Sequence, residues 1–167
     1  MARLAEITAL VSGFGAEAAR QIKTATLLHD IGKLKIPEGI LNKPGKLDVL
    51  EFEIVKTHTK LGAEMLRSLH GEIKTVAQNI AMFHHERHDG NGYWRKRTSD
   101  LPPYLPIAIL ADVYVALISE RPYKRPWTTE KAVDYIRKNA GTQFDPDMAE
   151  VFISLIVTDS RVAAIFI

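Results

Sequence analysis

The sequence has no cysteine among its 167 residues. A disulfide framework and a thiolate zinc site are therefore both excluded. Any metal ion must be held by histidine, aspartate, glutamate or water. These ligands suit iron, manganese, zinc or magnesium better than a softer metal.

Long hydrophobic runs are missing as well. No apolar run reaches about 18 residues, so the sequence predicts no transmembrane helix. The N-terminus lacks the charged start and apolar stretch of a signal peptide, and we expect a cytoplasmic location.

The net charge is only +2, which argues against bulk nucleic-acid binding. With 46% apolar and 25% charged residues, the chain is expected to form one globular domain over residues 1–167.

Apolar residues recur at helical spacing along most of the chain, and glycine or proline separates the segments. Asp48 is expected to cap a helix, with Glu51 three residues later completing a capping box. No stretch alternates over more than four residues, so the fold class is all-α, a bundle of about six to seven helices. Helices are expected at residues 2–11, 16–31, 48–58 (continuing or restarting over 61–69), 72–85, 107–119, 128–139 and from 146 onward.

The most informative stretch is residues 27–33, Leu-Leu-His-Asp-Ile-Gly-Lys, where an apolar run leads directly into His29 and Asp30. A buried charge is costly unless it is paired or bound to a metal. A single histidine at a helix end is more often a surface or capping residue, and His70 is read in that way. Six residues together favour a metal site over simple packing: His29, Asp30, His58, His84, His85 and Asp112.

Adjacent residues on a helix point about 100° apart, so His84 and His85 cannot bind one ion symmetrically and could each serve one of two neighbouring ions. The Asp30 carboxylate can bridge such a pair. Two ions about 3.5–4 Å apart can hold a bridging hydroxide and clamp a phosphate, which suggests phosphodiester hydrolysis. Lys33 is close enough to reach a phosphoryl oxygen, although a solvated loop lysine is an equally good reading.

A second basic pair follows the segment that carries Asp112. Arg121 offers bidentate donors to a phosphate or a guanine edge, and Lys124 offers a point charge. The alternative reading of both residues is a solubilising surface patch.

Four blocks of the sequence resemble the HD-GYP family, a branch of the HD-domain metal-dependent phosphohydrolases. The first runs from His29 through Lys33 to the segment Ile40–Leu47, and the second is His58-Thr59-Lys60-Leu61-Gly62. The third is His84-His85-Glu86-Arg87-His88-Asp89-Gly90-Asn91-Gly92-Tyr93, and the last joins Asp112–Leu117 to Arg121-Pro122-Tyr123-Lys124. The blocks occur in order between about Leu4 and Phe152.

The resemblance implies an HD-domain-like helical bundle that hydrolyses cyclic di-GMP to pGpG and on to GMP by a metal-bridging hydroxide. It implies two divalent metal ions, iron or manganese, with Asp30 bridging. It also implies that Lys33 contacts the scissile phosphate and that Arg121 and Lys124 bind the nucleotide. The metal ligands would be His29, Asp30, His58, His84, His85 and Asp112. Members of the family usually follow a sensory or receiver domain, so such a domain or a partner protein is expected to supply the input.

Three positions depart from the family pattern. A further ligand histidine would fall one position before Met1, so the domain is expected to be truncated at its N-terminus. Trp94 stands where the family motif has proline, and Val115 stands where it has an aspartate that reads guanine. Two alternatives therefore stay open: a weakly active or inactive domain that binds metal and nucleotide for signalling, and an HD phosphohydrolase acting on another nucleotide.

Overall fold

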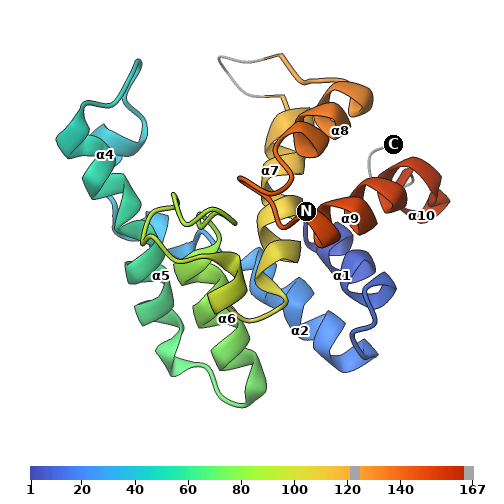
Figure 1. Cartoon of the computed structure of the whole chain (residues 1–167). Coiled ribbons are helices and arrows are strands. Elements are labelled where there is room, and N and C mark those ends of the chain that lie inside the picture. Colours follow the sequence, from blue (N-terminus) through green and yellow to red (C-terminus); the bar gives the residue numbers. More distant parts are fainter. Residues whose placement is uncertain (121–124, 164–167) are drawn as a thin grey trace.

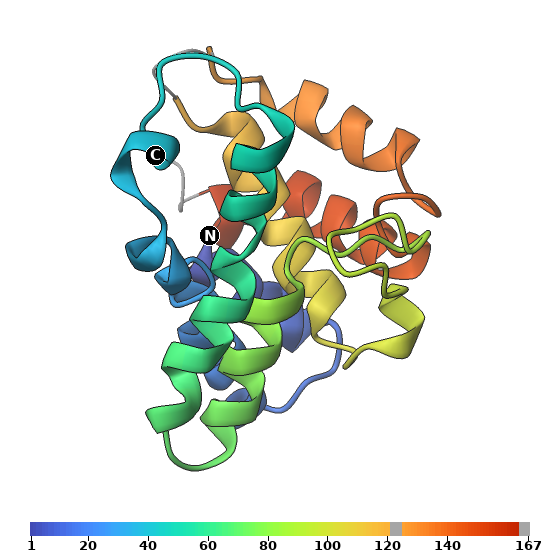
Figure 2. The same cartoon turned by 90° about the vertical axis from the view of Figure 1, so that its left-hand side faces the viewer.

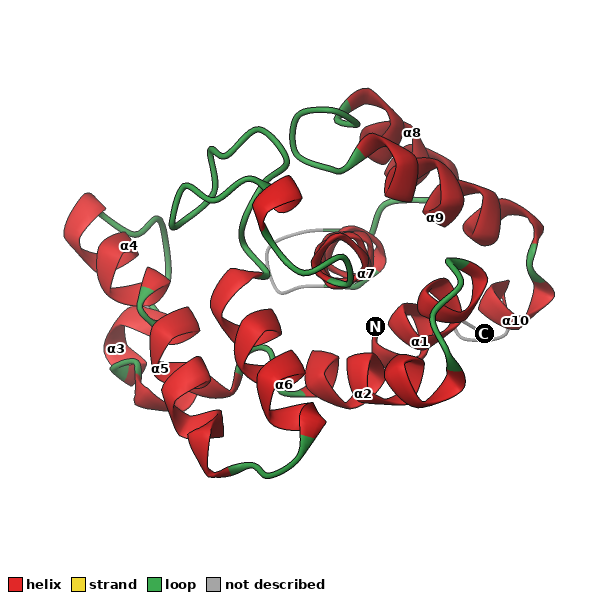
Figure 3. Cartoon of the chain, turned by 60° about the horizontal axis from the view of Figure 1, so that its bottom comes forward, coloured by secondary structure: helices red, strands yellow, loops and turns green. Residues whose placement is uncertain are grey.

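The computed structural model describes residues 1–120 and 125–163. This part of the chain is helical and forms no β-sheet, which confirms the all-α prediction (Figure 3). The α-helices are α1 (Ala2–Val11), α2 (Ala16–Leu27), α3 (Glu38–Leu41), α4 (Val49–Lys56), α5 (His58–Met65), α6 (Glu72–Phe83), α7 (Leu105–Ile118), α8 (Thr129–Lys138), α9 (Pro146–Thr158) and α10 (Ser160–Ala163). Three 3-10 helices join them: η1 (Ile31–Lys35), η2 (Leu66–Ser68) and η3 (Thr98–Asp100).

The centre of the bundle is α7, which Figure 3 shows end-on among the other helices. Its residues are apolar on all sides, apart from Asp112, as is typical of a helix surrounded by protein. Tyr114 of α7 packs against Phe152 of α9, with ring centroids 5.6 Å apart. On the other side of α7, α1, α2 and α6 contribute fully buried residues such as Leu4, Ile22 and Ile80.

The helix expected over residues 16–31 is shorter than predicted. It ends at Leu27, and the chain then tightens, because the amide of Ile31 donates to the carbonyl of Leu28. Such i to i−3 bonds are typical of helix ends and 3-10 turns. His29 and Asp30 consequently lie in a turn before η1 rather than on a regular helix.

The capping box at Asp48 is confirmed: its side chain accepts from the amide of Glu51, and the Glu51 side chain accepts from the amide of Asp48. The helix that it opens ends at Lys56, and α5 begins at His58 after a break at Thr57. Neither α3 nor α4 contains a buried residue, and Figure 1 shows both at the edge of the bundle.

The two views of the chain place the C-terminal ends of α2 and α6 near the start of α5 and the middle of α7 (Figures 1 and 2). All six predicted ligands lie on these segments. None of the helices described is both long enough and apolar enough to span a bilayer.

Candidate metal centre

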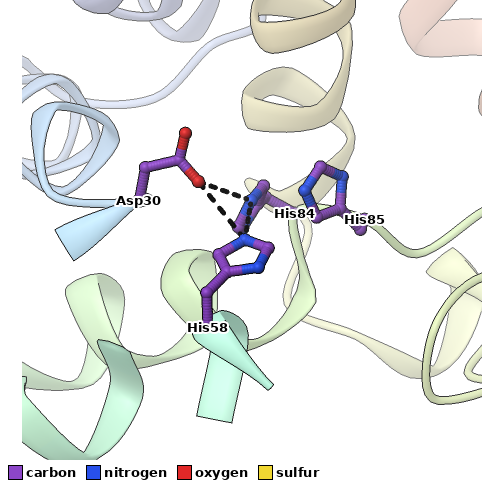
Figure 4. Close-up of side chains that lie close together, drawn as sticks. All are labelled: Asp30, His58, His84 and His85. Carbon is purple, nitrogen blue, oxygen red and sulfur yellow. Dashed lines mark hydrogen bonds and ion pairs between the residues drawn. The ribbon is translucent and has the colours of Figure 1, made fainter. Parts of the chain in front are cut away.

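Three ligand atoms converge where these segments meet. Asp30 Oδ1 lies 3.3 Å from His58 Nε2 and 3.7 Å from His84 Nε2. The two imidazole nitrogens are 3.4 Å apart (Figure 4). Both histidines are buried, so water has little access to this side of the cluster.

Backbone carbonyls fix the orientation of three of the imidazole rings. A carbonyl oxygen can only accept, so a ring nitrogen that contacts it must carry the proton. In a neutral ring, the opposite nitrogen then presents a lone pair, which is how histidines are prepared to bind metals. The Nδ1 atoms concerned are those of His29 (2.8 Å to Thr26 O), His58 (2.7 Å to Val55 O) and His84 (3.0 Å to both Ile80 O and Ala81 O).

The arrangement of these side chains brings three hydrogen-bond acceptors together, and none of the three donates to another. His58 Nε2, His84 Nε2 and Asp30 Oδ1 all present lone pairs to one another, and Asp30 Oδ1 is buried with no hydrogen-bond partner in the described part of the chain. A buried carboxylate without a partner is costly unless a cation neutralises it. These residues therefore fit a divalent metal ion.

His85 completes the group. One ligand atom each from Asp30, His58, His84 and His85 lies within 4.8 Å of the others. Burial, with the neighbouring histidines, lowers the pKa of His85 to about 2, so its ring is neutral at ordinary pH. Burial also lowers the pKa of His84.

The expectation that His84 and His85 diverge toward separate ions is corrected by this geometry. It assumed a helix through both residues, but α6 ends at Phe83 and His84 is its C-cap. The two rings therefore lie 4.0 Å apart between centroids, and both contribute to one four-residue group.

Two further predicted residues, His29 and Asp112, lie beside this group on the other side of the Asp30 carboxylate. His29 Nε2 lies 3.2 Å from Asp30 Oδ2 and 3.7 Å from Asp112 Oδ1. Burial alone would lower the pKa of His29, but the two carboxylates outweigh it and raise that pKa. Burial similarly opposes ionisation of Asp30, and the neighbouring His29 holds the Asp30 pKa below the ordinary range. The structure thus brings all six predicted residues together.

Lys33 Nζ donates to Asp30 Oδ2 at 2.5 Å. It lines a cavity of about 310 Å³ with Asp30, His85 and Asp112, and the facing wall of α7 is apolar: Val113, Ala116 and Leu117. Val115 packs against the hydrophobic core instead of lining the described cavity. Arg121 and Lys124 lie outside the described residues.

The HD domain family matches residues 1–148, which is most of the chain. The chain belongs to the HD domain family. Its relatives include the Xanthomonas campestris cyclic di-GMP phosphodiesterase response regulator RpfG, 40% identical over 147 residues, covering 87% of this chain and 39% of the relative. The 3′3′-cGAMP-specific phosphodiesterase 2 of Vibrio cholerae is 40% identical over 142 residues, covering 84% and 27%.

The fold of this HD domain is also that of a solved structure, Bd1817, an HDG"Y"P protein from Bdellovibrio bacteriovorus. The TM-score is 0.71 at 17% identity, covering 93% of this chain and 50% of the other. The resemblance to HD-GYP proteins is confirmed. The chain spans only about a quarter to two-fifths of the length of the curated relatives named above.

Sequence reasoning missed what holds the loop beside the site in this HD domain. The Glu86 carboxylate is buried and accepts from the amides of Trp94 (2.6 Å) and Lys96 (2.7 Å). Tyr93, which directly precedes Trp94, lies with its ring 4.5 Å from that of His85. A carboxylate placed directly after two ligand histidines and before a glycine-rich stretch was the available signal.

Proposed function

We propose that this chain is a metal-dependent phosphodiesterase that hydrolyses cyclic di-GMP to linear pGpG. One observation supports the metal site most directly: three hydrogen-bond acceptors, His58 Nε2, His84 Nε2 and Asp30 Oδ1, lie close together without a donor. A bound cation would neutralise this cluster. The names of the relatives support the choice of a cyclic dinucleotide as substrate.

The six clustered residues divide into two ligand sets that share Asp30. His58, His84 and His85 with Asp30 would hold one ion, and His29 and Asp112 with Asp30 would hold the other. The ligand atoms are all nitrogen or oxygen, which suits iron or manganese, the metals that the resemblance to the HD-GYP family implies. Divalent ions bound there supply Lewis-acid activation of water and neutralise charge on the phosphate.

Hydrolysis adds water to the scissile phosphorus and breaks its bond to the 3′-oxygen, which leaves with a proton. Lys33 contributes a positive charge at the mouth of the site, next to Asp30, and donates to the phosphoryl oxygens. Arg121 and Lys124 are proposed to bind the nucleotide, and in a longer protein a sensory or receiver domain supplies the input.

A second candidate substrate is 3′3′-cGAMP. The wall of α7 facing the cavity is apolar, and Val115, where the family pattern has a guanine-reading aspartate, packs into the core. An apolar wall contacts either purine without a hydrogen bond that would select one of them. We therefore expect weak discrimination between the two cyclic dinucleotides.

The test combines elemental analysis with turnover. The protein is purified anaerobically with iron, or with manganese, and then given each cyclic dinucleotide in turn. Bound metal and release of linear dinucleotide are expected, and both should be lost in Asp30→Asn. Bound metal and bound nucleotide without turnover would instead identify a signalling module, and absence of both would overturn the proposal.

A further inference from the structure

Trp94 makes three contacts beside the metal centre. Its indole Nε1 donates to Thr59 Oγ1 at 3.0 Å, and its amide donates to Glu86 Oε1 at 2.6 Å. Lys60 Nζ lies 3.8 Å from the centroid of the indole ring, as in a cation–π contact. A proline at this position has neither of the two donors and no ring of this kind.

The two hydrogen-bond partners of Trp94 each follow a histidine of the four-residue group. Thr59 follows His58, and Glu86 follows His85. Both partners are buried, at 0% and 1% exposure, so their positions are fixed by the surrounding protein. Trp94 therefore ties together the backbone segments that carry His58 and His85, although Thr59 and Trp94 are 35 residues apart in the sequence.

The loop before Trp94 has little freedom. A β-carbon on Gly92 would lie 2.5 Å from Glu86 Cα and 2.8 Å from the carbonyl oxygen of His85. The amide of Tyr93 donates to that same carbonyl. Once Trp94 and Glu86 are joined, the ring of Tyr93 is held 4.5 Å from the ring of His85 and 6.4 Å from that of His58.

His85 is the imidazole that depends on this packing. The rings of His29, His58 and His84 are anchored by backbone carbonyls, whereas the ring of His85 has no such hydrogen bond in the described part of the chain. Its orientation is set by ring contacts with His84, Tyr93 and His58.

We propose that Trp94 is a positioning residue: through Thr59 and Glu86 it sets Tyr93 against His85, and thereby orients the cluster imidazole that lacks a backbone anchor. The inference rests on the proposed metal site, but it does not depend on which nucleotide is hydrolysed. Outer contacts of this kind commonly change metal affinity.

The test is a double-mutant cycle on Co²⁺ affinity, measured by calorimetry on the full chain without substrate. Trp94→Phe keeps the backbone amide and an aromatic ring but removes the indole donor. We expect it to weaken Co²⁺ binding about three- to tenfold and to shift the visible absorption of the bound Co²⁺. In a His85→Ala background the same substitution is expected to change the affinity by less than about twofold.

The controls separate positioning from general stability. Lys60→Ala removes only the exposed cation over the ring, and we expect its Co²⁺ affinity to match wild type. An equal loss from Trp94→Phe with and without His85 would overturn the proposal, as would no loss at all. If the wild-type protein binds no Co²⁺, the proposed metal-dependent function itself would be wrong.

Discussion

Gly32 and His58 are in such close contact that a β-carbon on Gly32 would lie 1.9 Å from the carbonyl oxygen of His58. The same carbon would lie 2.5 Å from the amide nitrogen of Gly62. Gly32 directly follows the segment that the sequence predicts as helical (residues 16–31), and in the structure it has a packing role. It lets η1 lie directly against α5, so that Asp30 reaches His58.

Gly32→Ala is therefore expected to force η1 and α5 apart. Overpacking of this kind costs about 1–3 kcal/mol, and here the obstacles are backbone atoms that cannot rotate away. We expect a loss of about 3 kcal/mol in the free energy of unfolding, measured by urea denaturation, together with weaker manganese binding.

The matched control is Gly39→Ala. Gly39 lies in α3, where a β-carbon meets nothing within 4 Å and alanine is the better helix former. We expect this variant to be as stable as wild type or slightly more stable. Equal destabilisation by both substitutions would show that the contact between η1 and α5 is not tight.

Features that depend on nearby residues could be predicted from the sequence. The capping box at Asp48 needs only residues 48–51, and the apolar periodicity of α1 and α6 and the apolar run of α7 are visible in each segment. The clustering of histidine and aspartate side chains could be predicted because such residues at the ends of apolar runs need a partner when they are buried, and several of them occur in this chain.

Features that depend on contacts between residues distant in the sequence could not be predicted from it. α2 ends early at Leu27, before η1, which lies against α5, and the residues of α5 that η1 contacts are distant in the sequence. The bond from Trp94 to Thr59 joins segments 35 residues apart. The relation of His84 to His85 was misjudged because helix ends are uncertain by one or two residues, and here that uncertainty decides where both rings point.

Removing one ligand tests the metal centre directly. His58→Ala leaves Asp30 Oδ1 and His84 Nε2 without their shared neighbour. We expect manganese content measured by elemental analysis to fall by at least one ion per chain, and turnover of cyclic di-GMP to fall at least about a hundredfold. His70→Ala, which alters an exposed histidine, is expected to retain both. Full metal content in His58→Ala would contradict the assigned ligand set.

Lys33 is expected to act on the substrate rather than on the metal. Lys33→Met removes the charge that pairs with Asp30 Oδ2, leaving that oxygen at least as available to a cation. We expect turnover to fall about 10²–10³-fold, as for loss of one donor to developing charge, with manganese content unchanged.

Lys35→Met, two residues away and exposed, serves as the comparison and should be fully active. Loss of metal in parallel with activity in Lys33→Met would show that Lys33 supports the fold of the site instead of the phosphate.

The pH dependence of stability should reflect His85. Its pKa falls from an ordinary 6.5 to about 2 on folding, chiefly because of burial. Between pH 6.5 and about pH 2, the His85 side chain is protonated in the unfolded chain and neutral in the folded chain. The folded state is therefore most stable, with respect to this group, above pH 6.5, and it loses stability as the pH falls. The lowered pKa of His84 acts in the same direction, and the raised pKa of His29 acts in the opposite one.

From His85 alone, we expect the free energy of unfolding of the metal-free protein to fall by about 2 kcal/mol between pH 7 and pH 5, measured by urea denaturation with a chelator present. His85→Ala should flatten this dependence, because the unfolded variant has one fewer imidazole to protonate. His70→Ala, which removes an exposed imidazole, is the matched control. An unchanged slope in His85→Ala would mean that His85 takes up its proton in the folded protein near pH 6.5, and that its ring is not held neutral for a metal.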